Sequence, residues 1–323
     1  MRQWLRIILC ALILFALSGC ARQEPAEPAG QDTLLLGFAQ LGSESGWRIG
    51  NTESVKQAAE RAGVQLMFTN AQQSQEKQIK AIRSFIAYQV DVIAFPPIVE
   101  EGWDHVLAEA KDAGIPVLLV DRSIKISDPD LYAGFIGSDF LEEGYKAARF
   151  LLQKTEEWDE VRIVELTGTV DSTPMVDRSR GFSELLEGKE KYTIVDTISG
   201  DFLRSKGKEC MRQLLADHPD ANVLYSHNDS MTFGAIQAIE EAGYIPGKDI
   251  VIITVDGEQE AIDLLIRGKI NCVVECTPLF GDMVMETAMK LKRGEPIPKI
   301  LYSLEKVFTE FDEDLEFLPP RGY

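Results

Sequence analysis

The stretch PVLLVDR at residues 116–122 decides the fold class, because a run of apolar residues ends abruptly in two opposite charges. Runs of the same kind precede it, and longer amphipathic stretches such as 74–88 and 102–113 separate them. Continuous apolar runs that alternate with helices predict parallel strands covered on both faces. The preceding runs are TLLLGFAQ at 33–40, VQLMFTN at 64–70 and DVIAFPP at 91–97.

A second series of apolar runs follows the first. The right-handed crossover rule turns each series into a doubly wound unit. The sequence therefore predicts an α/β fold of two lobes with parallel sheets, a twofold structural repeat without obvious sequence repetition. The second series comprises AGFIGSD at 133–139, VRIVELTG at 161–168, YTIVDTISG at 192–200, ANVLYSHND at 221–229, DIVIITVDG at 249–257 and INCVVECT at 270–277.

The polar residues of these segments collect at the strand ends. In an open parallel sheet, ligands bind beyond the carboxyl ends of the strands, and the Asp121–Arg122 pair stands at such an end. Two lobes with polar strand ends predict a cleft between them. The other polar strand ends are GSESGW at 42–47, GTVDST at 168–173, GDFLRS at 200–205, SHNDS at 226–230, VDGEQ at 255–259 and ECTP at 275–278.

The residue types at these ends suit a carbohydrate. Sugar hydroxyls both donate and accept, so planar Asp, Asn and Arg groups satisfy them, and an aromatic face covers the C–H patch of the ring. Trp47 and Phe202 are the candidate aromatic pair. The candidate polar residues are Asp121, Arg122, Arg178, Asn228, Asp256 and Glu275.

Each candidate also has a simpler interpretation. Asp121–Arg122 would be a surface ion pair, Trp47 a core residue, and Asp256 the start of a tight turn. We expect Asp229, and not Asn228, to cap the following helix. Asp139 is expected to cap a helix or stiffen a hinge, Trp103 to pack at a helix start, and the roles of Gln72 and Gln73 stay open.

The N-terminus predicts a targeting segment. Arg2 and Arg6 precede an apolar core that is short for a transmembrane helix, and LSGC at 17–20 resembles a lipoprotein lipobox. Residues 1–19 would then be a signal peptide, Cys20 the lipidated residue, and the Pro- and Glu-rich stretch 20–32 a disordered tether. An ordinary signal peptide with an incidental cysteine is the alternative.

The net charge limits the classes of partner, and the cysteine spacing argues against a disulfide. The net charge of −19 disfavours nucleic acid and anionic lipid, so membrane contact is expected only through the anchor. Three cysteines remain after Cys20. Cys272 and Cys276 are too far apart in an extended run to bridge, and with Cys210 they are interpreted as packing residues.

Catalysis has little support in the sequence. The three histidines, His105, His218 and His227, lack metal-ligand spacing, and the chain has no nucleophile elbow and no phosphate-binding glycine loop. We therefore expect no enzyme activity, no cofactor and no metal. A sugar-active enzyme with Asp121 and Asp256 as paired carboxylates is the alternative.

The motifs resemble those of type I periplasmic sugar-binding proteins of ABC importers, in the ribose/galactose group, and most closely the galactofuranose-binding members. The similarity spans nearly the whole mature domain and is most specific in GSESGWR at 42–48. The loop VDST at 170–173 and the lipobox depart from the galactofuranose-binding pattern. Other matching stretches are LLVDRSI, VELTGTV, DRSRGF, SGDFLRSKGKE, SHNDSM and the closing GY.

The resemblance implies a set of ligand-contacting residues. Phe202 follows from the broader ribose-type pattern, and Glu275 stands where that group has a Gln, which implies a different hydroxyl pattern. The implied contacts are Glu44, Ser45, Trp47, Arg48, Asp121, Arg122, Arg178, Phe202, Asn228, Asp256 and Glu275.

The resemblance also implies a domain plan and a function. Lobe 1 would comprise residues 33–137 and 277–304, and lobe 2 residues 138–276 and 305–323, joined by a three-segment hinge. The expected protein is a monomeric, lipid-anchored substrate-binding protein in the cell envelope, outside the cytoplasm. Its partners would be a monosaccharide and the membrane permease and ATPase of an importer. Galactofuranose is the expected sugar, with galactose, arabinose or ribose as alternatives.

Two other functions share this fold. A sugar sensor would present the closed form to a sensor kinase or chemoreceptor, and the fold does not separate it from a transport protein. A transcription factor of the related repressor type would need an N-terminal helix-turn-helix, whereas residues 1–32 have the pattern of a signal and tether.

Overall fold

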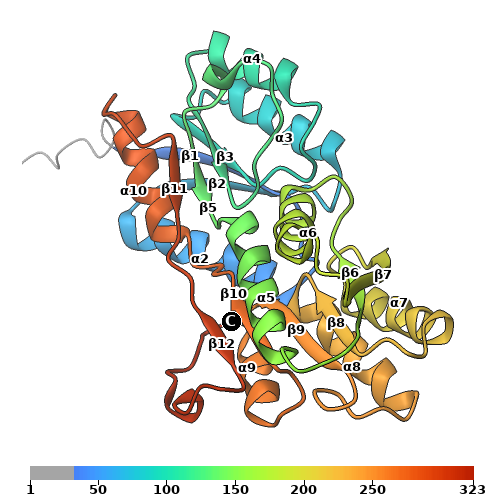
Figure 1. The fold of residues 1–323 in the computed structure, drawn as a ribbon. Coiled ribbons are helices and arrows are strands. Elements are labelled where there is room, and N and C mark those ends of the chain that lie inside the picture. The colour runs from blue at the N-terminus through green and yellow to red at the C-terminus, as the bar shows by residue number, and fades with distance from the viewer. Residues whose placement is uncertain (1–32) are drawn as a thin grey trace, which may run out of the picture. The chain divides into compact units, whose positions relative to one another are not determined.

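The apolar runs become the strands of two sheets in a computed structural model, which describes residues 33–323. The expected signal peptide, Cys20 and tether lie outside the described residues. Figure 1 shows the two sheets, each between layers of helices. Among residues 33–323, no helix is long and apolar enough to cross a membrane.

The first lobe is built on a sheet with the strand order β11-β5-β4-β3-β1-β2. Its paired strands are parallel. Its strands are β1 (Leu35–Gln40), β2 (Gln65–Asn70), β3 (Val92–Phe95), β4 (Val117–Val120), β5 (Gly134–Gly137) and β11 (Ile300–Tyr302). Its helices are α2 (Gly46–Ala62), α3 (Gln75–Ala87), α4 (Asp104–Asp112) and α10 (Gly281–Lys292), with the short helix η1 (Pro129–Leu131).

The second lobe repeats this order as β12-β10-β9-β8-β6-β7. All pairs are parallel except β12 with β10. Its strands are β6 (Val161–Thr167), β7 (Tyr192–Ser199), β8 (Val223–Ser226), β9 (Val251–Asp256), β10 (Cys272–Glu275) and β12 (Val307–Thr309). Its helices are α5 (Phe140–Lys154), α6 (Thr173–Leu186), α7 (Arg204–Asp217), α8 (Asp229–Glu241) and α9 (Gln259–Ile266), with η2 (Leu315–Phe317).

These two sheets confirm the predicted fold class. The chain passes from one sheet to the other after β5, after β10 and after β11. The strands β11 and β12 were not expected, because each has only three residues and most of them are not buried. They are edge strands whose hydrogen bonds come from a neighbour distant in sequence, so local pattern carries little information about them.

The core explains why the strands are apolar along their whole length. In β3, Val92 and Ala94 belong to one hydrophobic cluster, while Ile93 and Phe95 belong to another. Successive side chains of a strand point to opposite faces, so both faces of the sheet are buried. All four residues of β4 are buried, and this fixes the position of the charged pair that follows it.

Candidate functional site

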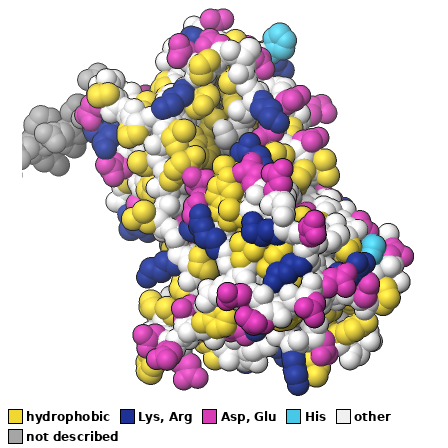
Figure 2. Space-filling model, viewed as in Figure 1, with side chains coloured by type: hydrophobic (Ala, Val, Ile, Leu, Met, Phe, Trp, Pro, Cys, Tyr) yellow, Lys and Arg dark blue, Asp and Glu magenta, His cyan; other side chains and the backbone are white. Residues whose placement is uncertain are grey.

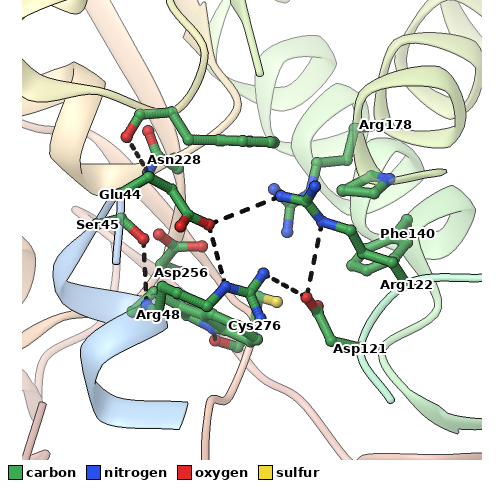
Figure 3. Close-up of a pocket in the computed structure, with 13 residues that line it drawn as sticks. Glu44, Ser45, Arg48, Asp121, Arg122, Phe140, Arg178, Asn228, Asp256 and Cys276 are labelled. Atoms are coloured by element: carbon green, nitrogen blue, oxygen red, sulfur yellow. Dashed lines mark hydrogen bonds and ion pairs between the residues drawn. The ribbon is translucent and has the colours of Figure 1, made fainter. Parts of the chain in front are cut away.

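A small cavity lies where the strand ends of the two lobes meet (Figure 3). It is lined by three arginines, three carboxylates, three aromatic side chains and smaller groups. The structure brings ten of the eleven predicted residues together here, and only Glu275 is elsewhere. The lining residues are Glu44, Ser45, Trp47, Arg48, Asp121, Arg122, Phe140, Pro174, Arg178, Phe202, Asn228, Asp256 and Cys276.

The first lobe contributes a network of paired charges. Ser45 is the N-cap of α2, and its hydroxyl accepts from the backbone N–H of Arg48 at 3.1 Å. This cap directs the Arg48 side chain into the cavity, where Nε donates to Glu44 Oε1 at 3.0 Å and Nη2 donates to Asp121 Oδ2 at 2.5 Å. The Glu44, Arg48 and Asp121 side chains are all 4% exposed or less, so solvent screens these pairs weakly.

The Asp121–Arg122 pair has a buried environment at the end of β4. Arg122 Nη1 donates to the carbonyl of Ile98 at 3.1 Å, and its guanidinium lies 3.8 Å from Asp121 and 3.9 Å from Glu44. Burial, followed by the nearby Arg48 charge, lowers the pKa of Arg122 to about 10. The surface ion-pair alternative is therefore wrong.

The second lobe holds Arg178 between two fixed acceptors. Arg178 Nε donates to Glu143 Oε2 and Nη1 donates to the carbonyl of His227, both at 2.6 Å. Burial raises the pKa of Glu143 to about 8, although the Arg178 charge opposes that shift. Glu143 lies on α5 and Arg178 on α6, so this ion pair fixes the guanidinium where it enters the cavity.

The cap of α8 differs from the sequence-based expectation. Asn228 is the N-cap, and its side-chain oxygen accepts from the backbone N–H of Met231 at 3.0 Å. The Asp229 carboxylate instead accepts from the N–H groups of Gly257 and Glu258, at 2.8 and 2.7 Å. The expectation that Asp229 caps this helix was wrong, because the carboxylate finds two donors in the loop after β9.

Asp256 ends β9 with an unusual backbone. Its φ is 125°, which is rare outside glycine, and Asp121 (φ 65°) and Phe202 (φ 62°) also have positive φ. Such conformations persist where the surrounding structure fixes them, and they concentrate at functional sites. Burial, then the nearby Asp229 charge, raises the pKa of Asp256 well above its ordinary value.

The aromatic residues form walls of the cavity beside the guanidinium groups. Trp47 Nε1 donates to the carbonyl of Cys276 at 2.6 Å, and the Arg48 guanidinium lies 4.6 Å from the Trp47 ring centre. Arg122 lies 5.3 Å from the Phe202 ring. Trp47 is 4% exposed, so it is both a packed residue and a lining residue.

Three lining residues were missed by sequence reasoning. Phe140, Pro174 and Cys276 line the cavity, and Arg178 lies 5.1 Å from the Phe140 ring. Phe140 follows the expected strand segment AGFIGSD, Pro174 follows the polar strand end GTVDST, and Cys276 lies within ECTP. They were not predicted because the sequence reasoning selected polar groups that bind hydroxyls, and these three residues are apolar.

Glu275 does not reach the cavity. Its carboxylate accepts from the Arg321 guanidinium and from the Lys306 backbone N–H. The next residue, Cys276, lines the cavity. Neighbours in an extended chain point in opposite directions, so these two residues face different partners.

Three polar atoms at the cavity lack hydrogen-bond partners within residues 33–323. These atoms are Arg48 Nη1, Arg122 Nε and Asp256 Oδ2. Buried polar groups are normally satisfied, and an unsatisfied one costs about 1–3 kcal/mol. The cavity therefore offers two donors and one acceptor to a small polar ligand.

In the described part of the chain, one group of side chains has metal-ligand spacing. The ligand atoms of Glu143, Cys276 and Glu305 lie within 4.8 Å of one another. However, Arg178 occupies one oxygen of Glu143, and Ser138 and the Thr277 N–H donate to Glu305. The two bonds to Glu305 join the segments after β5, β10 and β11, where the chain crosses between the sheets, and together these hydrogen bonds leave the three side chains poorly placed to hold a cation.

The remaining expectations concern residues around the cavity. Asp139 caps α5 by accepting from Glu142 N at 3.1 Å, as expected. Gln73 Nε2 donates to Glu44 Oε2 at 2.7 Å, so it supports a lining residue, whereas Gln72 is exposed and bonds to Lys77. Cys210, Cys272 and Cys276 are buried free thiols, and Trp103 is fully buried at the start of α4, both as expected.

Known proteins are similar to this chain in sequence and in fold. The chain is 40% identical to the galactofuranose-binding protein YtfQ of Escherichia coli K12 over 326 residues, which cover 99% of this chain and 100% of that protein. A protein of Mycobacterium smegmatis, solved in complex with β-D-fucofuranose, has 47% identity and a TM-score of 0.84. That match covers 86% of this chain and 92% of the other.

A third relative has the same fold. It is the periplasmic binding protein component of the arabinose ABC transporter from Shewanella sp. ANA-3, solved with α- and β-L-arabinofuranose. It has 43% identity and a TM-score of 0.84, with 88% of this chain and 93% of that one covered. Residues 36–296 match the family described as periplasmic binding protein domain. The resemblance seen in the sequence is thus confirmed, and the chain belongs to the periplasmic binding protein family.

Proposed function

We propose that this protein is the substrate-binding component of an ABC sugar importer and that it binds a monosaccharide in its furanose form. The observation that carries the proposal is the cavity with three polar atoms that no residue of 33–323 hydrogen-bonds, Arg48 Nη1, Arg122 Nε and Asp256 Oδ2. Sugar hydroxyls accept from guanidinium groups and donate to the oxygens of a carboxyl group, so one small ring can satisfy all three.

The names of the relatives support a five-membered ring. The three proteins compared above are described with galactofuranose, β-D-fucofuranose and L-arabinofuranose. We propose galactofuranose as the preferred sugar, with arabinofuranose as its nearest competitor.

Binding without turnover agrees with the state of the two candidate carboxylates. Asp121 accepts a short hydrogen bond from Arg48, which keeps it in place as a hydroxyl acceptor. Burial favours the neutral form of Asp256, which can both donate to and accept from a hydroxyl. We therefore assign both residues to recognition. Release of product from galactofuranosides incubated with the protein would contradict this assignment.

Calorimetric titration of residues 33–323 with monosaccharides tests the function. We expect binding of sugars that populate furanose forms, above all galactose through its galactofuranose fraction. We also expect methyl galactopyranoside, which is locked in the six-membered ring, to fail. The proposal is overturned if the locked pyranoside binds as tightly as galactose, or if no monosaccharide raises the melting temperature.

The cellular arrangement is a separate part of the proposal. Cys20 would carry the lipid, the tether would hold the binding domain outside the cytoplasm, and the closed form would dock on a permease served by an ATPase. Cys20→Ser should abolish incorporation of labelled fatty acid. Undiminished labelling of that variant would rule out the lipid anchor without affecting the binding proposal.

The distribution of surface charge does not favour binding of nucleic acid. On the face shown in Figure 2, acidic and basic side chains are intermingled and no large basic area is present. A net charge of −19 for the whole chain acts in the same direction.

A further inference from the structure

The N-terminus of α2 carries the first residues of the cavity, and it receives a carboxylate from the opposite lobe. The backbone N–H of Trp47 donates to Glu258 Oε1 at 3.2 Å. Ser230 Oγ lies 3.5 Å from both the Gly46 N–H and Glu258 Oε1. Trp47 and Gly46 belong to the first lobe, whereas Ser230 and Glu258 belong to the second.

The sequence of α2 makes this contact significant. The first turn of α2 has no acidic residue of its own, and Ser45 satisfies just one of its free N–H groups. The free N–H groups and the helix dipole favour a negative charge at this end. Glu258 supplies that charge from across the cleft.

Glu258 is free to do so because it does not cap its own helix. It is the N-cap of α9, yet its side chain makes no capping hydrogen bond there. Burial raises the pKa of Glu258, and the hydrogen bond from Trp47 opposes that shift. A Cβ on Gly46 would lie 2.3 Å from Glu258 Oε2, so the carboxylate sits directly against the α2 backbone.

The loop that presents Glu258 is braced on two sides. Asp229 accepts from the N–H groups of Gly257 and Glu258. On the other side, Arg321 Nε donates to the Gly257 carbonyl at 2.8 Å, and Gln259 N donates to the Tyr323 carbonyl at 2.9 Å. Asp229, Arg321 and Tyr323 do not line the cavity, so their hydrogen bonds act on the position of the loop.

The same C-terminal segment also explains the place of Glu275. Glu275 holds the Arg321 guanidinium, and Arg321 holds the Gly257 loop. Tyr323 then lies against α2, because a Cβ on Gly50 would be 3.0 Å from the Tyr323 Cβ. The closing residues therefore connect the loop of the second lobe with the helix of the first.

We infer that Glu258 is a positioning residue that latches the cleft: it caps α2 across the lobes, stabilises the closed form, and thereby slows release of the ligand. The inference rests on the proposed function for its ligand, but the latch itself is a property of the two lobes. The contact forms when the lobes come together, with or without sugar, and it must break before a bound sugar leaves, so its loss should change dissociation more than association.

Variants of Glu258 provide the first test, with a matched control on the same helix. Glu258→Ala should raise the dissociation rate of galactose about fivefold, leave the association rate within twofold, and leave the ranking of sugars unchanged. Glu258→Gln retains an acceptor without the charge and should have an intermediate effect. The control Glu260→Ala removes a carboxylate paired with the exposed Arg204 and should behave as wild type.

Gly46→Ala tests the latch from the other side of the cleft. The added methyl group displaces the Glu258 carboxylate but removes no cavity-lining side chain. Because alanine also favours the helix, the variant is expected to fold normally. It should nevertheless release sugar faster than wild type. A dissociation rate equal to that of Glu260→Ala, in both Gly46→Ala and Glu258→Ala, would overturn the latch.

A distance measurement without sugar separates this inference from the proposed function. Spin labels at Asp112→Cys on α4 and Gln237→Cys on α8 report the separation of the lobes, since both positions are exposed and the native Cys210, Cys272 and Cys276 are buried. Glu258→Ala should move the ligand-free distribution towards longer distances. An unchanged distribution overturns the latch, whereas failure of every sugar to bind wild type overturns the proposed function alone.

Discussion

The two lobes share one strand order but differ in how they hold their strand-end carboxyl groups, Asp121 and Asp256. In the first lobe, Arg48 is bonded to Glu44 and Asp121, so opposite charges are paired before any ligand arrives. In the second lobe, Arg178 is bonded to Glu143, but Asp256 Oδ2 has no partner within residues 33–323. Repetition of a fold therefore fixes where a site forms, and the strand-end residues decide how much of it is preassembled.

This difference predicts which changes affect stability and which affect affinity. Removing one member of a buried ion pair leaves its partner uncompensated and destabilises the protein strongly. Removing a group that has no partner in the protein leaves no other buried group uncompensated, so the free energy of unfolding should change little. Asp121 and Asp256 should therefore respond differently to equivalent substitutions.

The largest effect is expected for Arg178→Ala. This change leaves Glu143 buried without its cation and the His227 carbonyl without its donor. We expect a loss of about 3–5 kcal/mol in the free energy of unfolding, together with loss of detectable sugar binding. Urea denaturation measures the first quantity and titration the second. Arg180→Ala, an exposed neighbour on α6, serves as the control, and equal stability of the two variants would contradict the structural role of Arg178.

A pair of matched substitutions compares the two lobes directly. Asp121→Asn weakens the bond from Arg48, so both the melting temperature and the affinity should fall. Asp256→Asn changes a carboxyl group with one unpaired oxygen, so the affinity should fall about tenfold with little change in melting temperature. Thermal unfolding without sugar, followed by titration, measures both. Equal losses of melting temperature in the two variants would remove the proposed distinction between Asp121 and Asp256.

Asp229, in the second lobe, should make the free energy of unfolding depend on pH. Burial and the nearby Glu258 charge raise the pKa of Asp229 to about 8. An acid with a raised folded-state pKa stabilises the fold fully below its ordinary pKa of about 3.9, and that contribution is lost as the pH rises towards 8. Asn resembles the neutral acid, so Asp229→Asn should gain stability relative to wild type between pH 5 and pH 8. Urea denaturation at both pH values measures this, and parallel behaviour of the two proteins would show that Asp229 does not titrate in this window.

The sequence was sufficient for strands β1 to β10 and for the place of the cavity, because continuous apolar runs and polar strand ends are local signals. It was insufficient where a tertiary partner decides the outcome. Asn228 and Asp229 are both common capping residues, and the loop donors that attract Asp229 come from residues 257 and 258. The strands β11 and β12 are short and obtain their pairing from β5 and β10. Phe140 lines the cavity through the crossing of the chain after β5, which no local pattern reveals.

The smallest effect is expected at Glu275, which the family resemblance had assigned to ligand contact. In the structure its carboxylate accepts from Arg321 and from the Lys306 N–H, at 13% side-chain exposure and outside the cavity lining. Glu275→Gln keeps a side-chain acceptor for Arg321, so the loop at Gly257 remains braced and the affinity for sugar should change less than about threefold. The melting temperature should fall by no more than a few degrees, because a partly exposed ion pair contributes about 0–1 kcal/mol. Titration beside Asp256→Asn makes the comparison. A tenfold loss in both variants would return Glu275 to the binding site and would mean that β10 turns its last residue towards the ligand when the sugar is bound.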